Sequence, residues 1–127
     1  MMRFCSTAAV PFILTGMVAV VSAQAGQEAV IELRTVVGCL ASSGGGWMLD
    51  RATEGEPTER AFTSEDELDD SRRRALGSLS YRLLGVGEFA VGDHDGHKVQ
   101  VKGLRFSRDG ELRLNVTSFQ PLDPDCR

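Results

Sequence analysis

Basic residues are outnumbered in this 127-residue chain, which has 14 Lys and Arg against 18 Asp and Glu and a formal net charge of −4. This shortage excludes the broad basic footprint with which nucleic-acid-binding proteins neutralise phosphates. The negative field also opposes binding to anionic membrane surfaces. We therefore expect neither nucleic acid nor an anionic membrane surface as a partner.

Sequence motifs for catalysis are also missing. The two histidines, His94 and His97, are three residues apart, so no separate histidine is free for each of two catalytic roles. No serine lies in a Gly-x-Ser-x-Gly nucleophile elbow, and no loop ends in Gly-Lys-Ser/Thr to hold a phosphate. We expect a protein that is not an enzyme and that carries no cofactor.

Long hydrophobic runs are limited to residues 8–21, about 14 residues against the roughly 20 that a membrane-spanning helix needs. Arg3 precedes this run, and small residues follow it at Ala23-Gln24-Ala25, as in a secretory signal. We predict that residues 1–25 are a signal peptide, cleaved before Gly26 or alternatively before Gln24. The mature protein is then periplasmic or secreted, without stable membrane insertion.

Cysteine is rare as well, with three residues in the chain. Cleavage of the signal removes Cys5 and leaves Cys39 and Cys126. An oxidising compartment turns such an even pair into a disulfide. The bridge would close a loop of nearly 90 residues, which the chain-entropy model values at about 4–5 kcal/mol. Two free thiols or a metal-binding pair remain the alternatives.

The mature residues 26–127 suffice for one domain with one core. Their hydrophobic alternation predicts a mainly β fold with five strands, at residues 31–40, 47–52, 80–85, 98–106 and 112–119. Asp109-Gly110 predicts a hairpin between the last two. A five-stranded, OB-like antiparallel barrel, or a strongly curled sheet, would bury these strands without leaving long edges.

The alternation also predicts which side chains share a face. In the first strand, one face carries Ile31, Leu33, Thr35, Val37 and Cys39 and the other carries Glu32 and Arg34, which is typical of a half-buried strand. In the fourth strand, the inward positions are Val99, Val101 and Gly103, and the outward positions are Lys98, Gln100 and Lys102.

A charged insertion, residues 53–76, interrupts the strands. Ser64 and Glu67 have the spacing of a capping box, in which each side chain bonds the other residue's backbone N–H. One turn apart on the same helix, Asp69 could pair with Arg73, and Asp70 with Arg74. Because few residues in it are apolar, we expect a short surface helix or a partly disordered insertion, outside the core.

Several short segments together suggest a family. They are Val37-Gly38-Cys39-Leu40, Gly46-Trp47-Met48-Leu49, Tyr81-Arg82-Leu83-Leu84-Gly85, residues 94–103 and Leu114-Asn115-Val116-Thr117-Ser118. The chain resembles small secreted bacterial proteins with an OB-fold-like barrel and no assigned function. The resemblance covers most of residues 35–126, and the long acidic segment 53–74 departs from it. It implies a fold, and a fold of this kind hosts many unrelated ligands.

One cluster has metal-ligand chemistry. Asp93, His94 and His97 combine two imidazoles with a carboxylate, the donors that Zn²⁺ and similar ions take. In the alternative interpretation, Asp95-Gly96 only makes the turn into the next strand, His97 covers an end of the barrel and His94 is solvated.

A second set could form a ligand-binding face. OB-folds bind oligonucleotides and sugars with aromatic and basic side chains. The candidates here are Trp47, Tyr81, Arg82, Lys98 and Lys102. The alternative for the aromatic residues is packing in the core or at an end of the barrel.

The sequence leaves three functional hypotheses. The first is a non-catalytic binding module of the bacterial envelope or periplasm, whose partner is a small ligand, a glycan or an envelope protein. The second is an interaction or stabilising protein that docks a partner through the acidic insertion. The third is a metal-dependent hydrolase at Asp93, His94 and His97.

Overall fold

The structure is a computed structural model that describes Pro11 and residues 31–127. Apart from Pro11, the predicted signal peptide with its two cleavage sites and Cys5 lies outside the described residues. In the part of the chain that is described, no helix is both long enough and apolar enough to cross a membrane.

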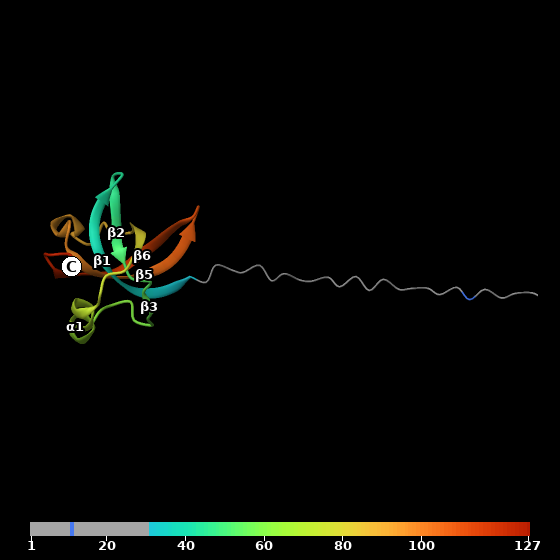
Figure 1. The fold of residues 1–127 in the computed structure, drawn as a ribbon, viewed down its shortest axis with the longest axis horizontal. Coiled ribbons are helices and arrows are strands. Elements are labelled where there is room, and N and C mark those ends of the chain that lie inside the picture. The colour runs from blue at the N-terminus through green and yellow to red at the C-terminus, as the bar shows by residue number, and fades with distance from the viewer. Residues whose placement is uncertain (1–10, 12–30) are drawn as a thin grey trace, which may run out of the picture.

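The fold is mainly β, with one short α-helix and one turn of 3₁₀ helix (Figure 1). The elements are β1 (Glu32–Ser43), β2 (Gly46–Ala52), β3 (Glu56–Pro57), α1 (Glu65–Arg73), β4 (Leu79–Leu84), η1 (Val91–His94), β5 (Lys98–Arg108) and β6 (Glu111–Asp123). All five predicted strands are present. The two-residue strand β3 was not predicted.

The strands form one sheet in the order β2-β4-β6-β5-β1-β3, and β2 also pairs with β1. Hydrogen bonds therefore run in a ring through five strands, while β3 pairs with β1 outside the ring. The pairing of β4 with β6 is parallel and the others are antiparallel. The expected all-antiparallel arrangement is thus wrong at this one pairing, because residues 85–110 carry the chain from β4 to β6 so that the two run in the same direction.

The core lies inside the ring. It holds the inward side chains predicted for the second to fifth strands, namely Leu49, Tyr81, Leu83, Val99, Val101, Leu114 and Val116. Trp47 and Leu112 pack against this cluster from its margin. Because buried side chains from all five strands occupy the interior of the ring, a ligand would have to bind on the outside of the molecule.

Strand β1 is buried on both faces, not half-buried as predicted. Val36 and Leu40 belong to the core cluster, although the predicted apolar face has odd numbers. Val37 and Cys39 point the other way and are also buried, at 1% and 6% exposure. The prediction failed because a strand that is covered on both faces has apolar residues on both. Alternation then does not show which face points into the core.

The hairpin between β5 and β6 has the predicted turn. Asp109 and Gly110 both have positive φ angles, 53° and 76°, as a tight hairpin turn requires. The pairing begins at Arg108 with Glu111 and continues along both strands, with register shifts at Lys98/Val99 and Lys102/Gly103.

Gly103 provides a test of this bulged pairing. A Cβ atom at Gly103 would lie 2.7 Å from the backbone oxygen of Asn115, which cannot move without disturbing β6. We expect Gly103→Ala to lower the free energy of unfolding by about 1–3 kcal/mol in urea denaturation. The control is Gly87→Ala, because nothing lies within 4 Å of the added Cβ. Equal stability of the two variants would contradict the close packing at Gly103.

Helix α1 lies against the outer face of the ring, and its ends are fixed by side chains. The predicted capping box of Ser64 and Glu67 is present at its start. The ammonium of Lys98 donates to the carbonyls of Arg72 and Arg74, at 2.9 and 2.8 Å, at the helix end. A cation is favourable there because the helix dipole is negative at its C-terminus.

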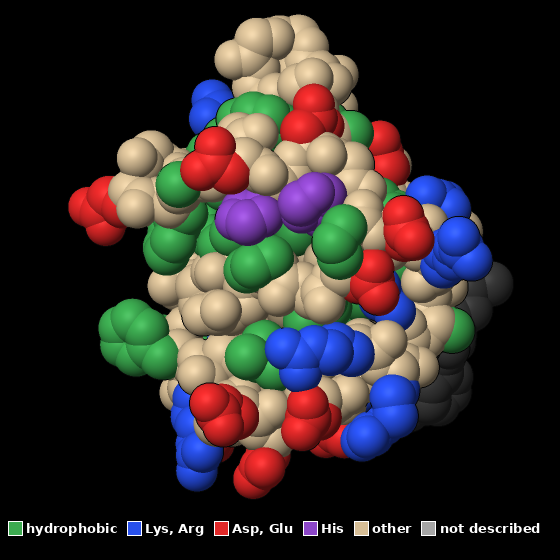
Figure 2. All heavy atoms as spheres, turned by 90° about the vertical axis from the view of Figure 1, so that its left-hand side faces the viewer, with side chains coloured by type: hydrophobic (Ala, Val, Ile, Leu, Met, Phe, Trp, Pro, Cys, Tyr) green, Lys and Arg blue, Asp and Glu red, His purple; other side chains and the backbone are tan. Residues whose placement is uncertain are grey.

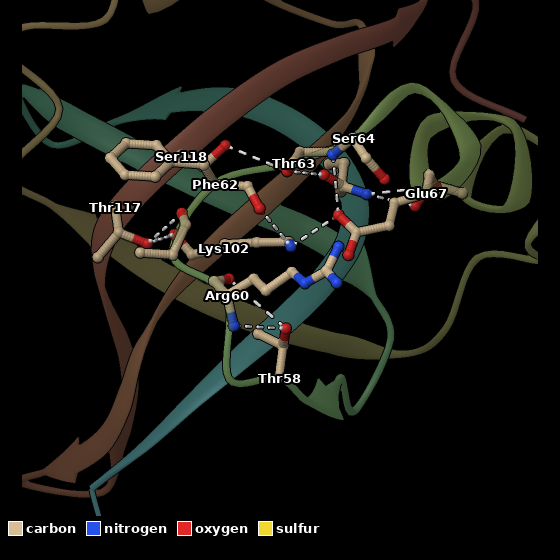
Figure 3. A network of polar contacts seen from close by, with 12 residues as sticks. Thr58, Arg60, Phe62, Thr63, Ser64, Glu67, Lys102, Thr117 and Ser118 are labelled. Carbon is tan, nitrogen blue, oxygen red and sulfur yellow. Dashed lines mark hydrogen bonds and ion pairs between the residues drawn. The ribbon is translucent and has the colours of Figure 1, made fainter.

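A layer of buried polar side chains joins α1 to the sheet (Figure 3). Gln100 donates to the hydroxyl of Ser71 at 2.7 Å and accepts from Thr63 at 2.7 Å. Lys102 donates to the backbone oxygen of Phe62 at 2.8 Å and to the Glu67 carboxylate at 2.7 Å. Lys98, Gln100 and Lys102 do point away from the core, as predicted, but α1 buries them to 5%, 0% and 0% exposure.

The charge pairs on α1 differ from the prediction. Asp69 pairs with Arg72 and Asp70 with Arg73, so the spacing is three residues instead of four. Arg74 is no longer helical and instead pairs with Glu56 on β3. The helix ends at Arg73, which is too early for the predicted pairing of Asp70 with Arg74 along a helical turn.

Candidate functional site

The five residues predicted as a ligand-binding face do not lie together. Tyr81 is fully buried, and its hydroxyl donates to the carbonyls of Thr53 and Glu54 at 3.0 and 3.1 Å. Burial raises the pKa of the Tyr81 phenol above its ordinary value. Lys98 and Lys102 are held beneath α1. All three side chains bond to the backbone or side chains around them, and Tyr81 and Lys102 are fully buried.

Trp47 and Arg82 lie on opposite faces of the β2–β4 pair. Trp47 is directly opposite Leu83, a core residue, and is partly buried against the core. Arg82 is opposite Met48 in the register. Its guanidinium donates to the carbonyl of Ser43 at 2.9 Å. Because neighbouring residues of a strand point to opposite faces, the two side chains cannot contact one small ligand together.

The structure does bring His94 and His97 together. His94 ends η1, and His97 precedes β5 after a turn in which Gly96 has a φ of +79°. Backbone bonds fix this turn to β1, since Gly96 donates to the carbonyl of Leu40 at 2.8 Å and Leu40 donates to that of His97 at 3.0 Å. The turn therefore has a defined position against a buried strand.

The two imidazoles are in direct contact. Their Nδ1 atoms are 3.2 Å apart, at hydrogen-bond distance. Such a bond requires one Nδ1 to carry a proton and the other to accept it. The ring of His94 also lies 5.9 Å from the ring of Phe119, centre to centre. Figure 2 shows both imidazoles side by side at the surface, next to hydrophobic side chains and with acidic side chains around them.

The end of β6 forms a wall beside the imidazoles. The disulfide between Cys39 and Cys126, with Cα atoms 5.7 Å apart, confirms the predicted bridge and ties this segment to β1. Arg51 adds a hydrogen bond to the backbone oxygen of Cys126 at 3.2 Å. A bridge next to the last residue prevents the terminus from fraying.

The imidazoles and this wall line an open surface hollow of about 290 Å³. We name it the His–Pro hollow, and its lining residues are His94, His97, Pro121, Leu122, Asp123 and Pro124. The lining is mainly apolar, with a few polar groups on it. Two other hollows are polar: one of about 170 Å³ beside Glu56 and Gln100, and one of about 190 Å³ beside Lys98 and Asp125.

Asp93 does not join the two histidines as a ready metal site. It is exposed on η1, and the residues that the structure describes hold no group of three or more His, Cys, Asp or Glu side chains placed to bind a metal ion. The predicted set of three is thus reduced to the pair His94 and His97.

Sequence reasoning missed the wall of the hollow, residues 121–124. The last strand was predicted to end at residue 119, but β6 continues to Asp123. One signal was available, because the predicted bridge from Cys39 to Cys126 implies that the residues just before Cys126 are held against the domain. The partner Cys39 lies directly before Leu40, whose backbone holds the His94–His97 turn.

Comparison of the chain with protein-family models, with curated proteins and with solved structures gives no match.

Proposed function

We propose that the chain is an exported, non-catalytic binding module of the bacterial envelope or periplasm, and that its ligand binds in the His–Pro hollow. The observation that carries the proposal is the character of this hollow. Small-molecule sites are concave, mainly apolar and of about 300–1,000 Å³, with a few polar groups that orient the ligand. A volume of about 290 Å³ lies just below that range and favours a small ligand.

Export is supported by the predicted signal peptide and is consistent with the disulfide, since disulfides persist in oxidising compartments. The proposed architecture is an OB-like barrel made by the ring of β1, β2, β4, β6 and β5. Its filled interior leaves the ends and the outer surface for binding. The resemblance to small secreted bacterial proteins points to the same architecture.

A binding role fits the histidine pair better than an enzymatic one. Each Nδ1 faces the other imidazole, whereas a nucleophile–base pair would direct it at a serine or a carboxylate. The pair thus lacks the arrangement in which a histidine activates a nucleophile and a third group orients it.

Docking of a partner through the acidic insertion is less well supported. On α1, Asp69 and Asp70 are already paired with arginines of the same helix. Deletion of the insertion would also be a poor test, because Gln100 and Lys102 would lose their partners beneath α1. The His–Pro hollow is therefore the surface to test first.

The test is a thermal-shift screen of the exported protein with monosaccharides, amino acids and nucleotides, in EDTA. A ligand present at 100 times its Kd should add about 2.7 kcal/mol of stability. Leu122→Trp, which fills the hollow, should abolish the shift. Leu104→Trp should keep it, because Leu104 is an exposed β5 residue six positions from Lys98. An unchanged shift in Leu122→Trp, or no shift with any probe, would contradict the proposal.

A further inference from the structure

The backbone around His94 and His97 fixes the position of both residues. The two residues are three positions apart in a turn whose backbone is bonded to Leu40 on both sides, and His97 N–H also donates to the carbonyl of His94 at 3.0 Å. The wall of the hollow beside them is fixed through Cys126. Both imidazoles are thus held on one rigid support, with their Nδ1 atoms directed toward each other.

The distance between these atoms matches a metal-ion chelate. Zn²⁺ binds imidazole nitrogen at about 2.0–2.1 Å with tetrahedral geometry, which places two neighbouring nitrogen ligands about 3.3–3.4 Å apart. Two neighbouring ligands of a square-planar ion at the same bond length would be only about 2.8–3.0 Å apart. The observed separation of 3.2 Å is closer to the tetrahedral value.

We propose that His94 and His97 bind a divalent, tetrahedrally coordinated metal ion of the Zn²⁺ type through their two Nδ1 atoms. The inference deepens the proposed function, because it rests on the same hollow. It concerns a different ligand class from the organic ligands of the screen above.

The proton balance of this binding is simple. In the metal-free pair, one ring carries its proton on Nδ1 and donates it to the other ring. To coordinate the ion, that proton moves to Nε2 of the same ring, and the Nδ1 lone pair becomes a metal ligand. Both rings then carry a proton on Nε2 and remain neutral, so the neutral pair binds the ion without net release of a proton.

Water or a donor atom of a molecule in the hollow would have to fill the other two positions of the tetrahedral ion, one more than the single exchangeable position of a catalytic zinc site. The surroundings favour a cation, since Asp123 lines the hollow and Asp93 and Asp95 are exposed on either side of His94.

The experiment is a calorimetric titration of ZnCl₂ into the exported protein after EDTA treatment and dialysis, with no organic ligand present. We expect one ion per chain. His94→Gln and His97→Gln should each abolish binding, while Asp93→Asn, a neighbouring residue outside the pair, should retain it. No binding to the native protein, or unchanged binding to the double glutamine variant, would overturn the inference.

Imidazole ¹⁵N NMR of the native protein keeps the inference testable even if a histidine variant misfolds. Zn²⁺ should move both Nδ1 resonances and leave both Nε2 atoms protonated, and metal coordination at Nε2 would overturn it. The thermal-shift screen for organic ligands is done in EDTA, and its control variant is Leu122→Trp. Its result is therefore independent of zinc binding, and either proposal can be refuted without the other. Zinc binding without any organic ligand would retain this inference alone, and the reverse result would retain only the proposed function.

Discussion

Loss of the Cys39–Cys126 disulfide is expected to lower the free energy of unfolding by about 4 kcal/mol, the largest single effect in this protein. The bridge joins residues 87 positions apart, so opening it returns a large amount of conformational freedom to the unfolded chain. Its Cα–Cα distance of 5.7 Å lies in the range of ordinary bridges. For a domain of this size, the melting temperature should fall by about 15–30 °C.

The measurement is urea denaturation of the native protein against the double variant Cys39→Ser with Cys126→Ser. Native protein kept in reductant is the matched control, because it loses the bridge without a change of sequence. Both should lose similar stability. A loss below about 1 kcal/mol in both would show that the C-terminal segment is held by other contacts and that the entropic account fails here.

Glu67→Gln is expected to cost about 1–3 kcal/mol. It removes the negative charge beside the ammonium of Lys102, which is 0% exposed and otherwise bonds the neutral backbone oxygen of Phe62. Removal of one partner of a fully buried pair costs about 3–5 kcal/mol, and the lower value here reflects the 32% exposure of the Glu67 side chain. Glutamine still suits the capping box, so the change isolates the carboxylate charge.

Glu65→Gln is the control on the same helix. It removes an acidic charge from the first turn, which costs about 0.3–1 kcal/mol through the helix dipole. Equal losses in urea for the two variants would mean that the ion pair with Lys102 adds nothing beyond the dipole.

The pH dependence of the Glu67 effect has a definite sign. The hydrogen bond from Lys102 holds the pKa of the Glu67 carboxyl below its ordinary value. The charged carboxylate therefore stabilises the fold fully at pH values above the pKa of glutamate in the unfolded chain, about 4.3. This stability is lost as the pH falls through the lower pKa that Glu67 has in the folded protein. The stability difference between the native protein and Glu67→Gln should thus be constant near pH 7 and shrink in acid. A difference that persists at pH 2–3 would contradict the assignment.

Several local signals in the sequence predicted the fold correctly, although the alternation in β1 and the charge pairs of α1 did not. The Asp109-Gly110 turn, the capping box at Ser64 and Glu67, and the alternation in β5 each depend on residues close together in the chain. The disulfide was also predictable, because the predicted cleavage would remove Cys5 and leave one possible pairing. These features led to the mainly β fold and to most of the core.

Pairings between distant residues were harder to predict. The parallel contact of β4 with β6 leaves no mark on either strand. The burial of Lys98 and Lys102 depends on α1, whose own sequence shows only a charged, weakly apolar helix. The wall of the His–Pro hollow was missed for the same reason, since Leu122 becomes part of a site only when the bridge brings it beside His97.

The most direct test of the account is backbone amide NMR of the oxidised protein, titrated with the strongest organic probe from the thermal-shift screen. We predict that the largest chemical-shift changes occur at residues 94–97 and 121–124 and disappear in Leu122→Trp. Changes centred on the exposed face of α1, or around the exposed side chains of Phe62 and Leu104, would contradict the assignment of the His–Pro hollow as the binding site.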